Sequence, residues 1–254
     1  METLFDIKKF PVSLSCVPST FENFKYMDMI FEICEKTGFI QIKNAPLLED
    51  IYVFPHNTSY GTLWKNLFKE FSNILKKYID TDTNIIEIGG GILLLANTII
   101  NEHVTLKKYT VYEKNIYDDN CNNKIEVIND YFNKSTLKTS QIKNKYNFFI
   151  HSHVLEHVWN PVEFIKLINE NITDNGHHCF IIPNLNVTFQ KCYTNALDFE
   201  HNFFITEDYV DIILHNNNFE ILDKVFYLDH SIIYITKKIK NESLKNESLK
   251  IKSY

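Results

Sequence analysis

Hydrophobic positions along the chain change their period near residue 80. Between Thr62 and Tyr78 they recur every three or four residues, which predicts an amphipathic helix. Beyond it, short apolar runs alternate with stretches of helical or loop length, which is typical of a parallel sheet with crossover helices. We therefore expect an α/β core from about 80 to 239. The predicted strands are Asn84–Ile88, Tyr109–Glu113, Lys124–Ile128, Tyr146–Ser152 and His177–Pro183.

The last part of this core has a different pattern. Thr206 can begin a helix with an acidic first turn, and Asn216–Asn218 can end it by supplying a left-handed residue. The runs Phe219–Leu228 and Ser231–Thr236 then follow with a short turn between them. This arrangement predicts an antiparallel hairpin at one edge of the sheet.

Both ends of the chain differ from the core. Residues 1–60 hold four of the six prolines and two β-leaning runs around a turn at Glu35–Gly38. Residues 240–254 contain the tandem repeat NESLKNESLK, which predicts a frayed end. We expect a small β module over 1–60, a main domain over 61–239 and a flexible tail over 240–254.

Composition excludes several classes of protein. The chain has 254 residues, a net charge of −6 and no arginine, so no guanidinium is present to bind phosphate or guanine, and nucleic acid is not expected as a partner. Five irregularly spaced cysteines argue against a disulfide framework. No signal peptide and no apolar stretch of membrane-spanning length are found, so we predict a cytoplasmic location.

Three consecutive glycines, Gly89, Gly90 and Gly91, separate the strand Ile85–Ile88 from a helical run. Glycine at such a turn lets a ligand approach the backbone, and the following helix offers free N–H groups. A nucleotide-like ligand is therefore expected. The dinucleotide fingerprint G-x-G-x-x-G is broken by Leu94, which disfavours a nicotinamide cofactor.

The pattern Glu87-x-Gly89-x-Gly91, followed by Glu113 at the end of the next strand, resembles the class I S-adenosylmethionine-dependent methyltransferases, although Leu93 stands where a third glycine is usual. The resemblance implies a Rossmann-like α/β sheet of parallel strands with an antiparallel edge hairpin. It also implies S-adenosylmethionine as cofactor. Its expected binding residues are Glu87, Gly89, Gly90, Gly91, Glu113 for the ribose hydroxyls, Asp130 and Tyr131 for the adenine, and Ser152.

The segment HSHVLEHVWNP resembles the VLEH-x-x-x-P motif of a subgroup that methylates small molecules and sugars. Asn160 can cap the following helix, Pro161 suits its first position, and Asn175-Gly176 can end it. The motif then lies at the carboxyl end of a parallel strand, where ligands bind in open α/β sheets. We expect catalytic residues among four side chains, a histidine serving as base for a hydroxyl acceptor: His153, Glu156, His157 and His201. For each of them a purely architectural role remains open.

The N-terminal segment resembles the module of methyltransferases that act on nucleotide-linked sugars, in which cysteines build a zinc ribbon. Here Thr37 stands where a second cysteine is expected after Cys34, and Cys16 with His56 leaves too few ligands. We predict no zinc there and no metal elsewhere. In the same family the segment around Tyr60 approaches the methionine end of the cofactor, so Tyr60 is a candidate binding residue or else a buried structural tyrosine.

The resulting hypothesis is methyl transfer from S-adenosylmethionine, with O-methylation favoured. The acceptor expected is a small molecule, a nucleotide-linked sugar or another phosphate-bearing precursor, including phosphoramidate-type ones, of capsule or lipopolysaccharide. Two alternatives stay open: a non-catalytic cofactor-binding partner of another methyltransferase, and a nicotinamide-dependent oxidoreductase. The sequence leaves the acceptor atom and the oligomeric state open.

Overall fold

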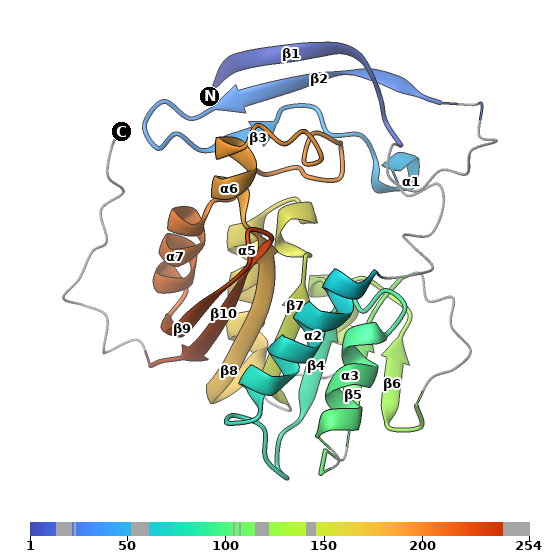
Figure 1. The fold of residues 1–254 in the computed structure, drawn as a ribbon, viewed down its shortest axis with the longest axis vertical. Helices are drawn as coiled ribbons and strands as arrows, with labels where there is room; N and C mark the ends of the chain where they lie inside the picture. The colour runs from blue at the N-terminus through green and yellow to red at the C-terminus, as the bar shows by residue number, and fades with distance from the viewer. Residues whose placement is uncertain are drawn as a thin grey trace.

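A seven-stranded sheet forms the centre of the molecule in the computed structural model (Figure 1). Five strands are parallel, and β10 and β9 add an antiparallel edge, as the sequence predicts. In spatial order they are β6 (Ile125–Ile128), β5 (Tyr109–Tyr112), β4 (Ile85–Ile88), β7 (Tyr146–Ser152), β8 (Ile172–Pro183), β10 (Ser231–Lys238) and β9 (Phe219–Tyr227). The structure describes residues 1–13, 22, 24–51, 61–103, 105–106, 108–114, 122–140 and 146–240.

Helices cover both faces of this sheet (Figure 1). On one face, α2 (Thr62–Leu75) and α3 (Leu94–Glu102) bury their apolar stripes against the strands, and Leu67 and Phe71 are fully buried. On the other face lie α4 (Lys134–Ser140), α5 (Pro161–Asn171) and α7 (Glu207–Asn216), whose core includes Ile165 and Leu214. The sheet is therefore a buried layer between two helical layers, which explains why its parallel strands are apolar on both sides.

The ends of two helices test the sequence reasoning closely. Asn160 caps α5 as expected, since its side chain accepts a hydrogen bond from the Glu163 N–H. The helix ends at Asn171 and not at Asn175-Gly176, so that prediction is wrong. Ile172 is fully buried and pairs with Tyr146, which draws the chain into β8 five residues before the predicted strand start at His177. Asn218 ends α7 with a left-handed φ of 58°, as predicted.

Thr206 occupies the N-cap position of α7, but its side chain makes no capping hydrogen bond. The acidic first turn, Glu207 and Asp208, instead supplies the charges that favour a helix N-terminus.

The N-terminal segment forms a separate antiparallel sheet of β1 (Glu2–Pro11), β2 (Tyr26–Ile33) and β3 (Ile40–Ile42). Short helix α1 (Leu48–Ile51) follows it. The small sheet lies beyond the carboxyl ends of the parallel strands, next to α6 (Leu185–Gln190) (Figure 1). The β2–β3 hairpin around residues 34–39 was expected, whereas β1 was not foreseen.

This small sheet does not have a core of its own. Met29 and Phe31 pack with Phe199 and Phe204, which belong to the connection between β8 and α7. Phe204 N–H donates to the Ile40 carbonyl, so the connection continues the edge of β3. Strands β2 and β3 therefore hold the connection in place.

Several predictions fall on residues that the structure does not describe: Tyr60, Cys16, His56 and most of the tail from 240 onward. The boundaries of the three predicted regions stay predictions. Among the described helices, none has the length and apolar character needed to cross a bilayer.

Candidate functional site

A cavity of about 1470 Å³ opens at the carboxyl ends of β4, β5 and β7. Its size exceeds the roughly 300–1,000 Å³ of an ordinary small-molecule pocket, so it has room for a cofactor and an acceptor together. Every predicted site residue that the structure describes lines it. They are Glu87, Gly89, Gly90, Gly91, Glu113, Asp130, Tyr131, Ser152, His153, Glu156, His157 and His201.

The glycine loop after β4 is shaped by close packing. A Cβ on Gly90 would lie 2.4 Å from Cγ1 of Val111, and Gly89 has a φ of +74°. The Gly91 N–H donates a hydrogen bond of 2.9 Å to Oε2 of Glu113. These contacts bring the loop against β5 and turn the backbone toward the Glu113 carboxylate.

Leu93 follows the loop with a φ of 60°, in the left-handed region that favours glycine. Its side chain is fully buried beneath α3, and the packing gained there offsets the strained backbone. Leu93 thus stands where the family pattern has its third glycine, and its backbone adopts the positive φ that favours glycine.

Glu87 lies at the base of the cavity on β4. Its Oε2 accepts a hydrogen bond of 2.7 Å from the Tyr109 hydroxyl. The pKa of Glu87 is raised to about 7, mainly by burial. The Tyr109 hydrogen bond opposes this rise, and the nearby Glu113 carboxylate adds to it. The carboxyl group therefore braces the two strands beneath the loop.

The turn after β6 supplies the groups expected at an adenine. Asp130 Oδ1 accepts a hydrogen bond from the Tyr131 N–H, and Lys114 lies 3.9 Å from the same carboxylate. The Tyr131 ring is exposed beneath the Lys114 ammonium, and Phe132 adds an apolar wall. These groups fit an adenosine-bearing ligand. The carboxylates can accept hydrogen bonds from its hydroxyl and amine groups, the glycine loop lets it approach the backbone, and the Tyr131 ring can stack on it.

His153 is held by hydroxyl groups at both ring nitrogens. Nδ1 lies 2.9 Å from Ser152 Oγ, and Nε2 lies 3.2 Å from Ser231 Oγ. Burial, with His230 nearby, lowers the pKa of His153 well below its usual value. The Trp64 ring packs against it, with centroids 4.5 Å apart. His153 is therefore a neutral, fixed imidazole, and its backbone φ of 53° marks a strained position.

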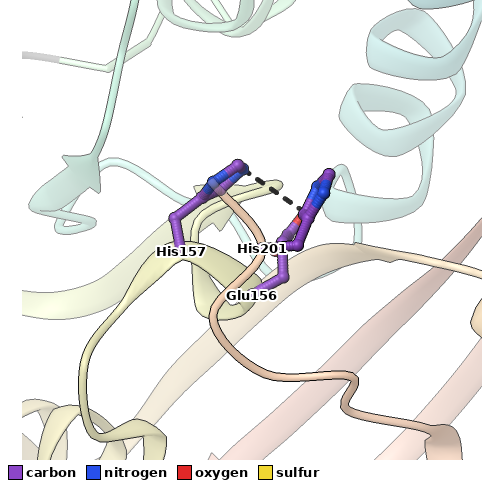
Figure 2. A group of neighbouring side chains, drawn as sticks. All are labelled: Glu156, His157 and His201. Atoms are coloured by element: carbon purple, nitrogen blue, oxygen red, sulfur yellow. Dashed lines mark ion pairs between the residues drawn. The ribbon is translucent and has the colours of Figure 1, made fainter. Parts of the chain in front are cut away.

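The other three candidate catalytic residues form one cluster, shown in Figure 2. Glu156 and His157 belong to the short 3-10 helix η1 (Leu155–His157), and His201 comes from the connection between β8 and α7. The two imidazole rings are 4.9 Å apart between centroids, and Glu156 Oε1 lies 4.0 Å from His157 Nε2. Sequence segments over forty residues apart thus meet at one wall of the cavity.

A hydrogen bond sets the orientation of the His157 ring, and an ion-pair contact holds the His201 ring. His157 Nδ1 lies 3.0 Å from the Glu200 carbonyl, which only accepts, so Nδ1 carries the proton and Nε2 the lone pair. His201 Nδ1 lies 2.9 Å from Oδ1 of Asp198. That carboxylate also accepts the backbone N–H groups of Glu200 and His201, so its position is fixed.

The pKa values of Glu156 and His201 in this cluster are shifted from their ordinary values. Burial raises the pKa of Glu156 to about 7, and the His201 ring partly opposes that rise. The pKa of His201 is raised to about 9; burial alone would lower it, but Asp198, with help from Glu156 and Glu200, outweighs that effect. His201 is therefore an imidazolium near neutral pH unless another cation replaces its proton.

The sequence reasoning missed Trp64 and Asp198, which line the cavity, and Ser231, which contacts the lining residue His153. Trp64 reads as part of the apolar stripe of α2, yet its ring contacts His153 and His230. Ser231 begins β10 and joins His153 to His230 through its hydroxyl. The signal that could have identified Asp198 is its place three residues before His201, within a polar stretch.

Comparisons with known proteins agree with this geometry. A family model described as "Methyltransferase domain" matches residues 60–224, well over half of the chain. No curated protein sequence matches the chain.

Solved structures of low sequence identity share the fold. A SAM-dependent methyltransferase from Aquifex aeolicus is 11% identical, with 71% of this chain and 100% of that chain covered and a TM-score of 0.52. The N-methyltransferase NodS from Bradyrhizobium japonicum, solved with S-adenosyl-L-homocysteine, is 11% identical over 71% and 89%, with a TM-score of 0.52. An O-methyltransferase family protein from Burkholderia thailandensis is 8% identical over 70% and 60%, with a TM-score of 0.51.

The family match, the seven-stranded sheet and the cavity at its carboxyl edge agree with one another. This chain therefore belongs to the class I S-adenosylmethionine-dependent methyltransferases, and S-adenosylmethionine is its cofactor.

Proposed function

We propose that this methyltransferase transfers the methyl group to a hydroxyl oxygen of a small acceptor. The observation that carries the proposal is the His157 tautomer: Nδ1 is bound to the Glu200 carbonyl, which leaves the lone pair on Nε2. A hydroxyl acceptor must lose a proton during methylation, and an imidazole nitrogen suits that task. A sulfonium bound at the glycine loop supplies the methyl carbon.

The proposed roles divide the cavity in two. The glycine loop, Glu87, Glu113, the Asp130–Tyr131 turn and Ser152 form the cofactor half. Glu156, His157 and His201 form the acceptor half, with His153 as a neutral wall between the halves. We also propose that Tyr60, which lies outside the described residues, binds the methionine end of the cofactor.

Charge favours an acceptor whose reacting end is uncharged. Among the described lining residues, the only lysines are Lys114 and Lys134, and each has a carboxylate within 3.9 Å, from Asp130 and Glu163 respectively. In the acceptor half the cation is His201, which is paired with the Asp198 carboxylate. A phosphate on the acceptor would therefore lie away from the Glu156 cluster.

The finer proposal is that the acceptor is a nucleotide-linked sugar or another phosphate-bearing precursor of capsule or lipopolysaccharide, methylated in the cytoplasm. Its support is the small N-terminal sheet, which packs on the connection that bears His201. A sugar hydroxyl entering the acceptor half, with its phosphates outside, meets both the charge and the space requirements.

The test is a methyl-transfer assay with labelled S-adenosylmethionine and paired acceptors, each nucleotide-linked sugar beside its free sugar. We expect product mass and acid stability to identify an O-methyl group on the nucleotide-linked member. Methylation of amines alone would overturn the O-methyl proposal. Binding of S-adenosylhomocysteine without any transfer would favour a non-catalytic partner, and absorbance of a bound nicotinamide would favour an oxidoreductase.

A further inference from the structure

In the described part of the chain, one group of side chains can supply the ligands of a metal centre: Glu156, His157 and His201. Each offers one ligand atom, and these atoms all lie within 4.8 Å of one another. Two imidazoles and a carboxylate are the ligand set that divalent first-row transition metals accept with open positions for a substrate. The sequence reasoning foresaw no metal here.

A second observation points to a missing partner. Glu156 is 3% exposed, and its Oε2 has no hydrogen-bond partner among the described residues. A buried carboxylate oxygen without a partner is costly, and such groups are rare in folded proteins. A cation held between this oxygen and the two imidazoles would remove that cost.

The surroundings of both histidines match those of metal ligands. His157 Nδ1 is bound to the Glu200 carbonyl, and His201 Nδ1 faces the fixed Asp198 carboxylate. Metal-bound histidines are usually oriented in this way, by a carbonyl or carboxylate at the nitrogen that does not touch the ion. This orientation places His157 Nε2 on the side of Glu156, 4.0 Å from Oε1.

The three ligand atoms, which lie within 4.8 Å of one another, must move closer together to share one ion. Ligand atoms around a tetrahedral zinc lie about 3.4 Å apart, given metal–ligand distances of about 2.1 Å. Glu156 Oε1 and His157 Nε2 lie 4.0 Å apart. Rotation of the side chains within the cavity wall can close this difference, because η1 and the 191–206 connection keep the backbones adjacent.

We propose that Glu156, His157 and His201 bind one divalent transition metal ion, of the class of Zn²⁺, Co²⁺, Mn²⁺ or Fe²⁺, which holds the oxygen of the acceptor. This inference rests on the proposed O-methylation for the role of the ion. The ion takes the Nε2 lone pair of His157, so in the metal-bound site the ion replaces that nitrogen as the group that promotes loss of the acceptor proton. The acceptor oxygen coordinates the ion, its O–H bond breaks, and the proton passes to water. The oxygen then forms a bond to the methyl carbon while the carbon–sulfur bond breaks and its electron pair stays on sulfur.

Titration of chelator-stripped full-length protein with Co²⁺ tests the site directly. We expect one Co²⁺ per chain, with a visible absorption band and heat of binding. Glu156→Gln, His157→Ala and His201→Ala should each weaken binding tenfold or more. Asp198→Asn, which acts through His201, should weaken it by roughly 10–100-fold. His215→Ala, on α7 and outside the cavity, is the matched control and should bind as the wild type does.

Circular dichroism and S-adenosylhomocysteine binding identify variants that fail to fold, and Glu156→Gln keeps the shape of the side chain. No Co²⁺ binding by the wild type, or equal binding by the His157→Ala/His201→Ala double variant, would overturn the metal site. Full hydroxyl methylation by metal-free protein would also overturn it and leave the proposed function standing. Site-dependent Co²⁺ binding without methylation of any hydroxyl would keep the site and overturn the proposed function.

Discussion

The backbone N–H of Gly91 donates its hydrogen bond to the carboxylate of Glu113 and thereby joins the loop after β4 to the end of β5. The carboxylate sets the loop and also faces the cavity. One side chain thus shapes the cofactor half and offers oxygens to it.

Replacement of Glu113 should weaken the cofactor complex. Hydrogen bonds that involve a charged group contribute about 1.5–3 kcal/mol, so Glu113→Ala should raise the Kd for S-adenosylhomocysteine roughly 10–100-fold. Isothermal titration calorimetry measures it. Glu126→Gln, at an exposed position on β6, is the control. Equal Kd values for Glu113→Ala and wild type would refute the assignment of Glu113 to the cofactor.

The close packing of Gly90 on Val111 predicts a rescue experiment. In Gly90→Ala the new Cβ meets Val111 Cγ1, which should cost about 1–3 kcal/mol of unfolding free energy and weaken cofactor binding. Gly90→Ala/Val111→Ala should recover most of the lost cofactor binding, while its unfolding free energy stays below that of the wild type because truncation of the buried Val111 removes core packing. Gly61→Ala serves as the control, because nothing lies within 4 Å of its added Cβ. Failure of the double variant to recover would show that the contact is not the cause.

Glu87 predicts a pH dependence of stability. Its pKa is about 7 in the folded chain against 4.5 for the ordinary group, so the proton stabilises the fold fully below pH 4.5. That contribution, roughly 3 kcal/mol, is lost as the pH rises through 7. Glu87→Gln does not titrate, so its unfolding free energy should exceed that of the wild type more at pH 8 than at pH 5. Urea melts at both pH values measure this, and a pH-independent difference between the two proteins would contradict it.

The proposed role of His157 predicts that its replacement slows methyl transfer and leaves the cofactor affinity nearly unchanged. His157→Gln should lower the methyl-transfer rate by about 10²–10⁴-fold, since the nitrogen that faces the acceptor is lost. The Kd for S-adenosylhomocysteine should stay within about threefold of the wild-type value, because His157 lies in the acceptor half. Steady-state kinetics beside calorimetry separates the two. A normal rate would remove His157 from the chemistry.

The shared core of the N-terminal sheet predicts joint unfolding. Phe199 is fully buried between that sheet and the main domain, so Phe199→Ala should cost about 3–5 kcal/mol. We expect a single transition by circular dichroism and by the fluorescence of the two tryptophans, Trp64 and Trp159. Phe226→Ala, exposed on β9, should change little. Two separated transitions would instead show that residues 1–60 fold on their own.

Rules that use only neighbouring residues predicted much of the fold, because the conformations that these residues favour agree with the tertiary structure. The Asn160 cap, the Asn218 terminus and the hairpin of β9 and β10 each depend on neighbouring residues, and the structure contains all three. The end of α5 could not be predicted in this way. Ile172 fits the helical stripe, but its burial beside Tyr146 is a tertiary contact that draws it into β8.

The site shows the same division. Strand order, the glycine loop and the family resemblance indicated many of the residues that line the cavity, whereas Trp64 and Asp198 were missed. The partners of those residues were not accessible from the sequence: Ser231 reaches His153 from 78 residues away, and the Glu200 carbonyl reaches His157 from 43 residues away. Such contacts arise from the path of the whole chain, and no periodicity signals them.

Because Met29 and Phe31 pack against Phe199 and Phe204, the small N-terminal sheet leaves the ribosome well before the side chains that cover it are made. Its strands carry exposed apolar side chains such as Leu4 and Phe5. During translation this stretch is therefore the part of the molecule most exposed to wrong pairing, and chaperone contacts should concentrate on it.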